Sequence, residues 1–110
     1  YIIQLGPWTL YHSGDTVLFP ELAGYLKPYT PLVAFLPING TDPRRRVAGN
    51  LNAKEAVWLS TSIGARMTIP GHFHLFEFNT VDPDEFIDLA EKQDLHYAVL
   101  QHGQRLNLEL

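Results

Sequence analysis

A continuous apolar run, LVAFL at residues 32–36, lies between two prolines in the middle of this chain. An uninterrupted apolar segment of this length between turn signals is typical of a strand that is buried on both faces. The segments around it alternate between strand and helix character. The run therefore favours an α/β or α+β fold with one mixed β-sheet and about three helices.

Three further stretches have strand character. Residues 1–5 and 8–12 flank Gly6-Pro7, a turn signal that predicts a β-hairpin. Residues 66–70 predict another short strand. Residues 97–101 and 105–110 predict two closing strands joined around His102-Gly103-Gln104.

Three helices are expected between these strands. The first covers residues 19–26, with Leu22 and Leu26 inward, and ends before Pro28. Asn52 and Glu55 form the pattern of a capping box for the second helix, which ends at Gly64. Its expected apolar face is Ala56, Val57, Trp58, Leu59 and Ile63.

The third helix is expected to be capped by Asp82, with Pro83 in its first turn and Glu85 capping in return. Phe86, Leu89 and Ala90 follow at helical spacing. With helices on one side only, the other face of the sheet is also apolar. No segment of the sequence is left over to cover it.

Composition places the chain among globular domains. It has 110 residues, 45% of them hydrophobic and 18% charged, so it is the size of one domain, and residues 1–110 are expected to form a single unit. The net charge of −4 argues against nucleic-acid binding. The sequence has no cysteine, which mildly favours a cytoplasmic location, and no apolar run of about 20 residues that would span a membrane.

The chain begins with Tyr1 inside an expected strand, without an initiator methionine or a signal peptide. We therefore expect it to be a piece of a longer polypeptide.

Two polar segments, HSGDT at residues 12–16 and IPGHF at residues 69–73, follow expected strands. Loops at strand ends are where scaffolds present chemistry. Asp15 and His72 are candidate metal ligands, and zinc, manganese or iron accepts this mixture of oxygen and nitrogen. The alternatives are an Asx turn at Asp15 and a packed loop histidine at His72.

Two other histidines are candidates near this site. His74 would share one face of an extended segment with His72, and a His-x-His pair can chelate zinc. His12 could orient a ligand from behind. Both also fit ordinary roles, in core packing and at a strand end.

The loop at residues 39–50 contains Arg44, Arg45 and Arg46. Arginines can bind a carboxylate or phosphate through paired hydrogen bonds. Together with Asn39 they are candidate contacts for an anionic small-molecule substrate. The alternative is a solvated loop.

The order of these segments resembles the C-terminal half of a metallo-β-lactamase-fold hydrolase. The resemblance lies in HSGDT, in the buried strand that runs into LPING at residues 36–40, in the helix with Glu55-Ala56, and in the IP-x-H pattern that ends at His72. Among such proteins the chain is most similar to the L-ascorbate-6-phosphate lactonase-like branch.

The resemblance implies half of an αββα sandwich with a mono- or dinuclear metal site at one edge. Asp15 matches the carboxylate that bridges two metals, and is the implied catalytic residue, and His72 matches the last histidine ligand. Zinc is the implied metal, with manganese as the alternative. The H-x-H-x-D-H motif of such proteins belongs to an N-terminal half that is absent here, and relatives often have His at the position of Gly71 and an acidic residue at that of His74.

The implied parent protein is a metal-dependent hydrolase of a lactone, ester or phosphoester. The isolated chain is expected to be inactive. One alternative is a noncatalytic half-domain that pairs with another subunit, or with a second copy as a homo-oligomer. Another is a small metal-binding module that uses His72 and His74 in a cupin-like barrel.

Overall fold

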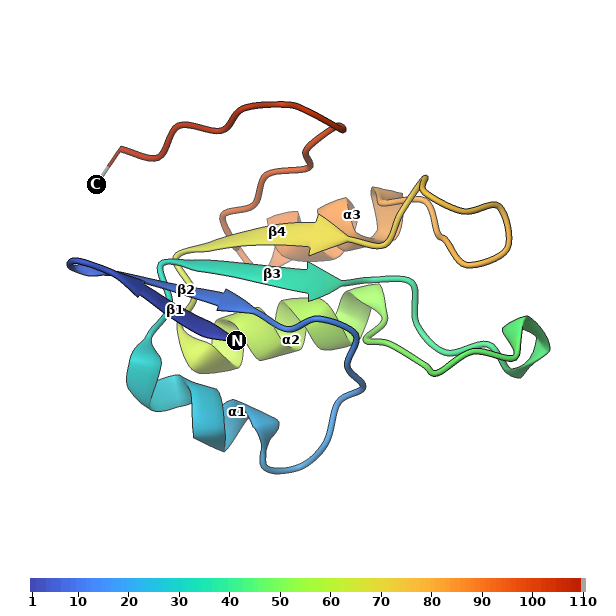
Figure 1. Ribbon diagram of the computed structural model, residues 1–110, viewed down its shortest axis with the longest axis horizontal. Coiled ribbons are helices and arrows are strands. Elements are labelled where there is room, and N and C mark those ends of the chain that lie inside the picture. Colours follow the sequence, from blue (N-terminus) through green and yellow to red (C-terminus); the bar gives the residue numbers. More distant parts are fainter. Residues whose placement is uncertain (110) are drawn as a thin grey trace.

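A four-stranded mixed sheet forms the centre of the computed structural model, which describes residues 1–109 (Figure 1). Its strands occur in the order β1-β2-β3-β4, and their bounds are Ile2–Leu5, Trp8–His12, Val33–Pro37 and Met67–Gly71. β1 pairs antiparallel with β2, whereas β2, β3 and β4 are all parallel. The hairpin, the buried central strand and the mixed sheet are confirmed.

β3 lies between two parallel neighbours, and its residues alternate between the two faces of the sheet. Ala34 pairs with Tyr11 on one side and Thr68 on the other, and it has no exposed surface. Leu36 is also buried on the helical face. Phe35 points to the opposite face and is half-buried.

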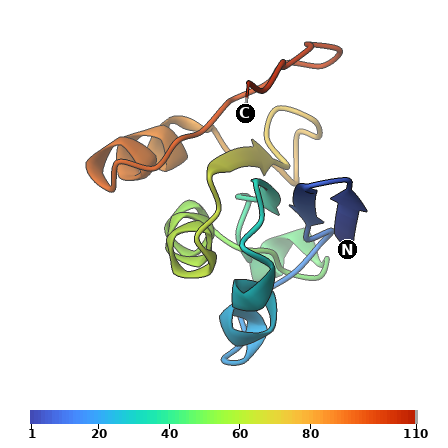
Figure 2. The same ribbon diagram turned by 90° about the vertical axis from the view of Figure 1, so that its left-hand side faces the viewer.

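Three α-helices and two short 3-10 helices complete the fold. They are α1 (Leu22–Leu26), η1 (Lys27–Tyr29), η2 (Pro43–Arg45), α2 (Ala53–Ile63) and α3 (Asp84–Lys92). α2 packs against β3 and β4, and it also contacts α1 and α3. The helices therefore lie on one side of the sheet, as Figure 2 shows.

α2 begins and ends as its sequence predicts. The Asn52 side chain accepts a hydrogen bond from the Glu55 amide at 2.8 Å, and the Glu55 carboxylate accepts one from the Asn52 amide at 2.9 Å. Gly64 ends the helix with a φ of 68°. The buried residues are Ala53, Ala56, Val57, Leu59, Ser60 and Ile63.

Trp58 was expected on this apolar face, but 51% of it is exposed. The buried stripe follows positions 56, 59, 60 and 63, which recur at three and four residues along one side of a helix. Trp58 falls outside that stripe.

The expected cap of α3 is wrong in its details. Pro83, in helical conformation, takes the N-cap position, and the Asp82 carboxylate accepts a hydrogen bond from the Asp84 amide at 2.9 Å. In residues 1–109 no hydrogen bond joins the Glu85 side chain to Asp82. The Asx turn around Pro83 already satisfies Asp82, so no reciprocal capping box forms.

The two strands predicted at the end of the chain are absent from residues 97–109, and Leu110 lies outside the described residues. A single parallel bridge joins Thr68 to Tyr97, and the chain then leaves the edge of β4. A turn forms at His102-Gly103, as expected. The segment beyond it has no neighbouring strand with which to form a ladder, and strand propensity alone does not make a strand.

The face of the sheet opposite the helices is only partly covered. Leu108 and Glu109 lie beside Val33 and Met67 on that face, while Phe35 stacks only on the His12 ring, at 5.6 Å between centroids. None of the helices in the described part of the chain is long and apolar enough to cross a membrane.

The capping box gives a direct test of this fold. Replacing Asn52 with alanine removes the acceptor of the Glu55 amide, and we expect the free energy of unfolding to fall by about 1 kcal/mol. Chemical denaturation of the chain, followed by circular dichroism, measures the change. Asn52→Ser keeps an acceptor at the same position and should recover most of the loss; equal losses in both variants would contradict a capping role.

Candidate metal centre

Asp15 and His72 meet at one edge of the sheet. Because β2, β3 and β4 are parallel, their carboxyl ends share this edge (Figure 1). Asp15 lies three residues after β2, and His72 directly follows β4. The distance from the Asp15 Oδ1 atom to the His72 Nε2 atom is 2.8 Å. The two residues that the sequence singled out are therefore in direct contact.

A tight turn presents Asp15. Gly14 has a φ of 62°, a conformation that glycine adopts without strain, and its amide donates a hydrogen bond of 3.0 Å to the His12 Nδ1 atom. The Ser13 amide is tied to the carbonyl of Phe35 at 3.1 Å. His12 thus stabilises the turn that carries Asp15.

The backbone at His72 is held in an unusual conformation. Its φ of 60° lies in the left-handed region, where a residue with a side chain incurs a cost of about 1 kcal/mol or more. The preceding Gly71 is fixed because its carbonyl accepts a hydrogen bond from the Ile38 amide at 3.1 Å. The Nδ1 atom of His72 is buried and has no hydrogen-bond partner within the described residues. An imidazole held at such a cost is more typical of a functional side chain than of a packing one.

Asn50 holds Asp15 and the residue that follows it. Its side-chain oxygen accepts a hydrogen bond from the Thr16 amide at 2.9 Å, and its side-chain nitrogen lies 3.4 Å from Asp15 Oδ1. The Leu51 amide donates to the Thr16 carbonyl at 2.8 Å. Asn50 is only 3% exposed, so this clamp is shielded from competing water.

A chain of side-chain amides extends from Asn50 to the loop after β4. The Asn50 side-chain nitrogen donates to Asn39 Oδ1 at 3.0 Å, and the Asn39 side-chain nitrogen donates to Asn79 Oδ1 at 2.7 Å. Asn39 is buried, so its amide is used within this network. The sequence analysis missed Asn50 and Asn79. The only signal was their position in loops, which does not reveal contacts between residues 34 to 40 positions apart.

His74 lies apart from His72. A φ of 51° at His74 turns the chain, so residues 72–74 are not extended, contrary to the expectation that both rings share one face. The His74 Nε2 atom lies 3.5 Å from Asp82 Oδ2. The pKa of Asp82 is lowered chiefly by the hydrogen bond from the Asp84 amide, with a smaller contribution from His74.

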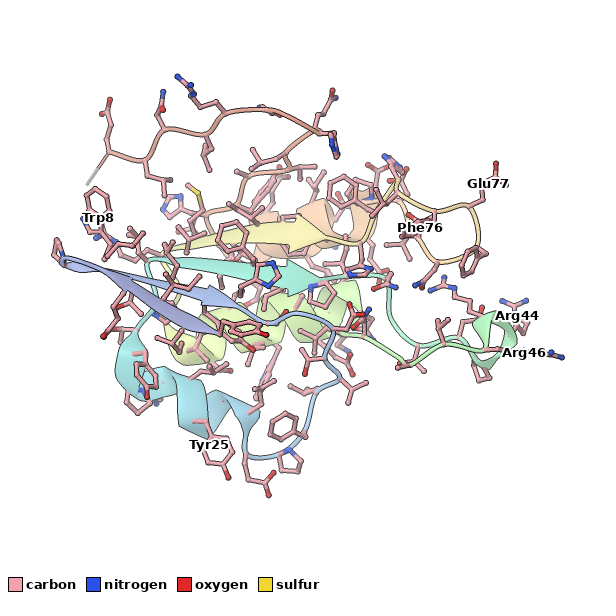
Figure 3. The ribbon with its side chains drawn as sticks, in the orientation of Figure 1. Trp8, Tyr25, Arg44, Arg46, Phe76 and Glu77 are labelled. Carbon is pink, nitrogen blue, oxygen red and sulfur yellow. The ribbon has the colours of Figure 1, made fainter. Side chains whose placement is uncertain are left out.

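The three arginines have separate environments. Arg44 forms paired hydrogen bonds with the Asp42 carboxylate, the shortest at 2.8 Å. Arg45 donates to the carbonyls of Asn39 at 2.8 Å and Thr80 at 3.2 Å, so it joins the two loops. Arg44 and Arg46 lie at the tip of their loop and point away from the sheet edge, as Figure 3 shows.

The donors at this edge suit a divalent metal in kind but not in number. Asp15 and His72 line a hollow of about 210 Å³, and the carboxylate and imidazole point to the same place. Oxygen and nitrogen donors of this kind bind zinc and manganese. Within residues 1–109, however, no group of three histidine or acidic side chains could hold a metal ion. Asp15 and His72 are thus two candidate ligands, and the described residues form an open sheet with helices instead of the cupin-like barrel expected for a module based on His72 and His74.

Known proteins resemble this chain in sequence. The chain is 30% identical over 109 residues to a UPF0173 metal-dependent hydrolase of Methanosarcina mazei, and 34% identical over 110 residues to one of Thermococcus kodakarensis. Each comparison covers 98% of this chain but only 44% and 45% of those proteins. No family model matches the sequence.

Solved structures agree with the sequence comparison. Igni18, a metallo hydrolase from Ignicoccus hospitalis, superposes on 99% of the chain with a TM-score of 0.80 and 26% identity, over 45% of its own length. YhfI of Bacillus subtilis, a metallo-β-lactamase-fold protein, superposes on 94% of the chain with a TM-score of 0.69 and 17% identity, over 41% of its own length. The chain has the fold of part of a metallo-β-lactamase domain. It spans less than half the length of these relatives.

The clamp at Asn50 leads to a prediction about stability. Asn50→Leu leaves the Thr16 amide and Asn39 Oδ1 without their partner, and we expect the free energy of unfolding to fall by about 1 to 3 kcal/mol. Denaturant titration of the chain measures this change in the free energy of unfolding. Asn107→Leu, in the exposed C-terminal segment, is the control and should change stability by less than about 0.5 kcal/mol. Similar losses in the two variants would contradict the clamp.

The Asp42–Arg44 pair leads to a pH prediction. The side-chain hydrogen bond from Arg44 lowers the pKa of Asp42 from 3.8 to about 2. Because this pKa is depressed in the folded state, the pair stabilises the loop above the unfolded pKa, and the contribution is lost as the pH falls from about 4 towards 2. Carboxyl ¹³C NMR of the chain across this pH range measures the midpoint.

Arg44→Gln is the matched variant, and it should return the pKa of Asp42 towards 3.8. A midpoint that stays near 2 in Arg44→Gln would show that another group lowers it.

Proposed function

We propose that this chain is the C-terminal half of a metal-dependent hydrolase and that Asp15 and His72 contribute to its metal site. The 2.8 Å contact between Asp15 Oδ1 and His72 Nε2 is the observation that carries the proposal. The similarity to UPF0173 metal-dependent hydrolases over 98% of the chain supports the reaction class.

The remaining ligands would come from the part of these relatives that the chain does not span. The open face of the sheet supports this, because a second sheet would bury Phe35 and its neighbours. The N-terminal half of the same domain is therefore the proposed partner.

Each residue of the site has a proposed role. Asp15 and His72 would hold a divalent ion, which we take to be zinc, with manganese as the alternative. When bound, such an ion lowers the pKa of a coordinated water and polarises the substrate oxygen. Asp15 can also accept a proton from a nucleophilic water at its second oxygen, and Asn50 and His12 keep its carboxylate in place.

The proposed substrates are lactones, simple esters and phosphoesters, and a relationship to the ascorbate-6-phosphate lactonase-like branch stays part of this proposal. Arg44 and Arg45 form hydrogen bonds within the protein, and Arg46 points away from the edge with Asp15 and His72. Contacts between these arginines and an anionic substrate would therefore require this loop to rearrange. The absence of cysteine in the sequence supports a cytoplasmic location.

A noncatalytic half-domain is the second candidate. It would retain the Asp15–His72 contact as a fold element, since an ion pair between two loops can also stabilise a structure. The two candidates differ in whether the site binds metal once the domain is complete.

The test joins the chain to the N-terminal half of one of the UPF0173 relatives. We expect the complete domain to retain at least one zinc ion per chain and to hydrolyse a member of a panel of lactones, esters and phosphoesters. Asp15→Asn and His72→Ala should each lower kcat by about a thousandfold or more and weaken zinc binding.

His96→Ala is the matched control, because His96 is an exposed histidine away from the hollow. It should keep both activity and metal content. A complete domain that binds no metal, or hydrolysis by the 110-residue chain alone at the same rate, would contradict the proposal.

A further inference from the structure

A second hollow lies beside the sheet edge where Asp15 and His72 meet. It is formed between the loop after β4 and the C-terminal segment. Its volume is about 400 Å³, which is within the range of small-molecule sites. It shares Pro70, Gly71 and His72 with the hollow that contains Asp15. A molecule whose reacting bond lies at Asp15 and His72 could therefore extend into this second hollow.

The first wall of this hollow is residues 72–75, and its shape depends on two strained positions. His72 and His74 both have left-handed backbone conformations, with φ of 60° and 51°. Phe73 between them packs against the hydrophobic core and contacts the His74 ring edge-on, at 5.5 Å between centroids. Leu75 follows at the rim with 58% of its surface exposed. Backbone strain that the surrounding structure maintains, here beside Asp15 and His72, is typical of functional sites.

The second wall comes from Leu100, Gln101 and His102. It is anchored from below, because the Ala98 amide donates to the Thr68 carbonyl at 3.1 Å. It is closed above by a turn in which the Gln104 amide donates to the Gln101 carbonyl at 3.0 Å, and the Gln104 side chain accepts from the Gln101 amide at 3.0 Å. The hollow is therefore formed before any ligand binds.

The chemistry of this hollow differs from that of the arginine loop. Pro70, Phe73, Leu75 and Leu100 give it an apolar lining, and its polar groups are imidazoles and one amide. Among residues 1–109, no lysine, arginine, aspartate or glutamate lines it, so those residues offer no carboxylate, ammonium or guanidinium group to a ligand in the hollow. Apolar surface with few polar groups suits an apolar group of a ligand.

We propose that this hollow, defined by Pro70, Phe73, Leu75 and Leu100, binds an apolar acyl or alkyl group of the substrate, while Asp15 and His72 act on its ester bond. The proposal rests on the proposed function and adds the substrate class: esters or lactones with a hydrophobic chain. It places the anionic groups of the substrate, if present, outside the hollow.

The test uses the ¹⁵N-labelled chain without metal and a non-hydrolysable probe, hexanamide, with acetamide as the short-chain comparison. We expect hexanamide to shift the amide signals of residues 72–75 and 100–102, and acetamide at the same concentration to leave them unchanged. Signals that move equally around exposed Trp58 or Tyr25, or an equal response to acetamide, would overturn the proposal.

Leu75→Asn is the decisive variant, since Leu75 is exposed and its replacement leaves the core intact. It should weaken hexanamide binding by about threefold to fivefold, because the side chain contributes apolar contact area. Leu5→Asn is the matched control: Leu5 is exposed to a similar extent, 53%, but lies on β1. An equal loss in both variants would show nonspecific binding and overturn the proposal.

Activity of the complete domain separates this proposal from the proposed function. Hydrolysis of hexanoyl esters in preference to acetyl esters, with the preference reduced in Leu75→Asn, supports both. Hydrolysis without a chain-length preference overturns the apolar subsite and leaves the hydrolase assignment standing. Binding of hexanamide in a complete domain that holds no metal overturns the hydrolase assignment and leaves the apolar site standing.

Discussion

The parallel pairing of β2, β3 and β4 is the constraint on which the candidate site depends. Parallel strands bring their carboxyl ends to one edge, whereas a β4 that ran in the opposite direction would place His72 at the far end of the sheet from Asp15. β2 and β4 are not neighbours, and two strand spacings amount to about 10 Å. The turn at Gly14 and the left-handed His72 bring the side chains across this gap, to 2.8 Å.

At this edge of the sheet, stabilising hydrogen bonds surround residues whose own conformation is unfavourable. His72 has a strained backbone and a buried nitrogen without a partner, and neither contributes to stability. The compensating interactions lie just behind, where Asn50 binds the Thr16 amide and the Leu51 amide binds the Thr16 carbonyl. Stabilising groups are therefore placed around Asp15 and His72 and not at them. This division is common where function requires a conformation that folding alone does not favour.

The open face of the sheet and the small number of candidate ligands are both explained by the proposed missing half. Asp15 and His72 are two candidate ligands, fewer than a catalytic metal needs, and a sheet with helices on one side leaves apolar side chains such as Phe35 only partly covered. The relatives are more than twice as long as this chain, and the additional length can supply both the remaining ligands and the second sheet. The same edge, however, already includes two contiguous hollows of different character.

Local chemistry determined much of this protein from its sequence alone. The Gly6-Pro7 hairpin, the buried strand between prolines, the Asn52–Glu55 capping box and the positions of Asp15 and His72 after strands all depend on neighbours within a few residues. Tertiary structure decided the rest. Trp58 is exposed because of the stripe that α2 presents to the sheet. Residues 97–109 form a single bridge, from Tyr97 to Thr68 of β4, because the chain then leaves the edge of that strand. Asn50 lies beside Asp15, 35 positions away in sequence, and only folding brings the two together.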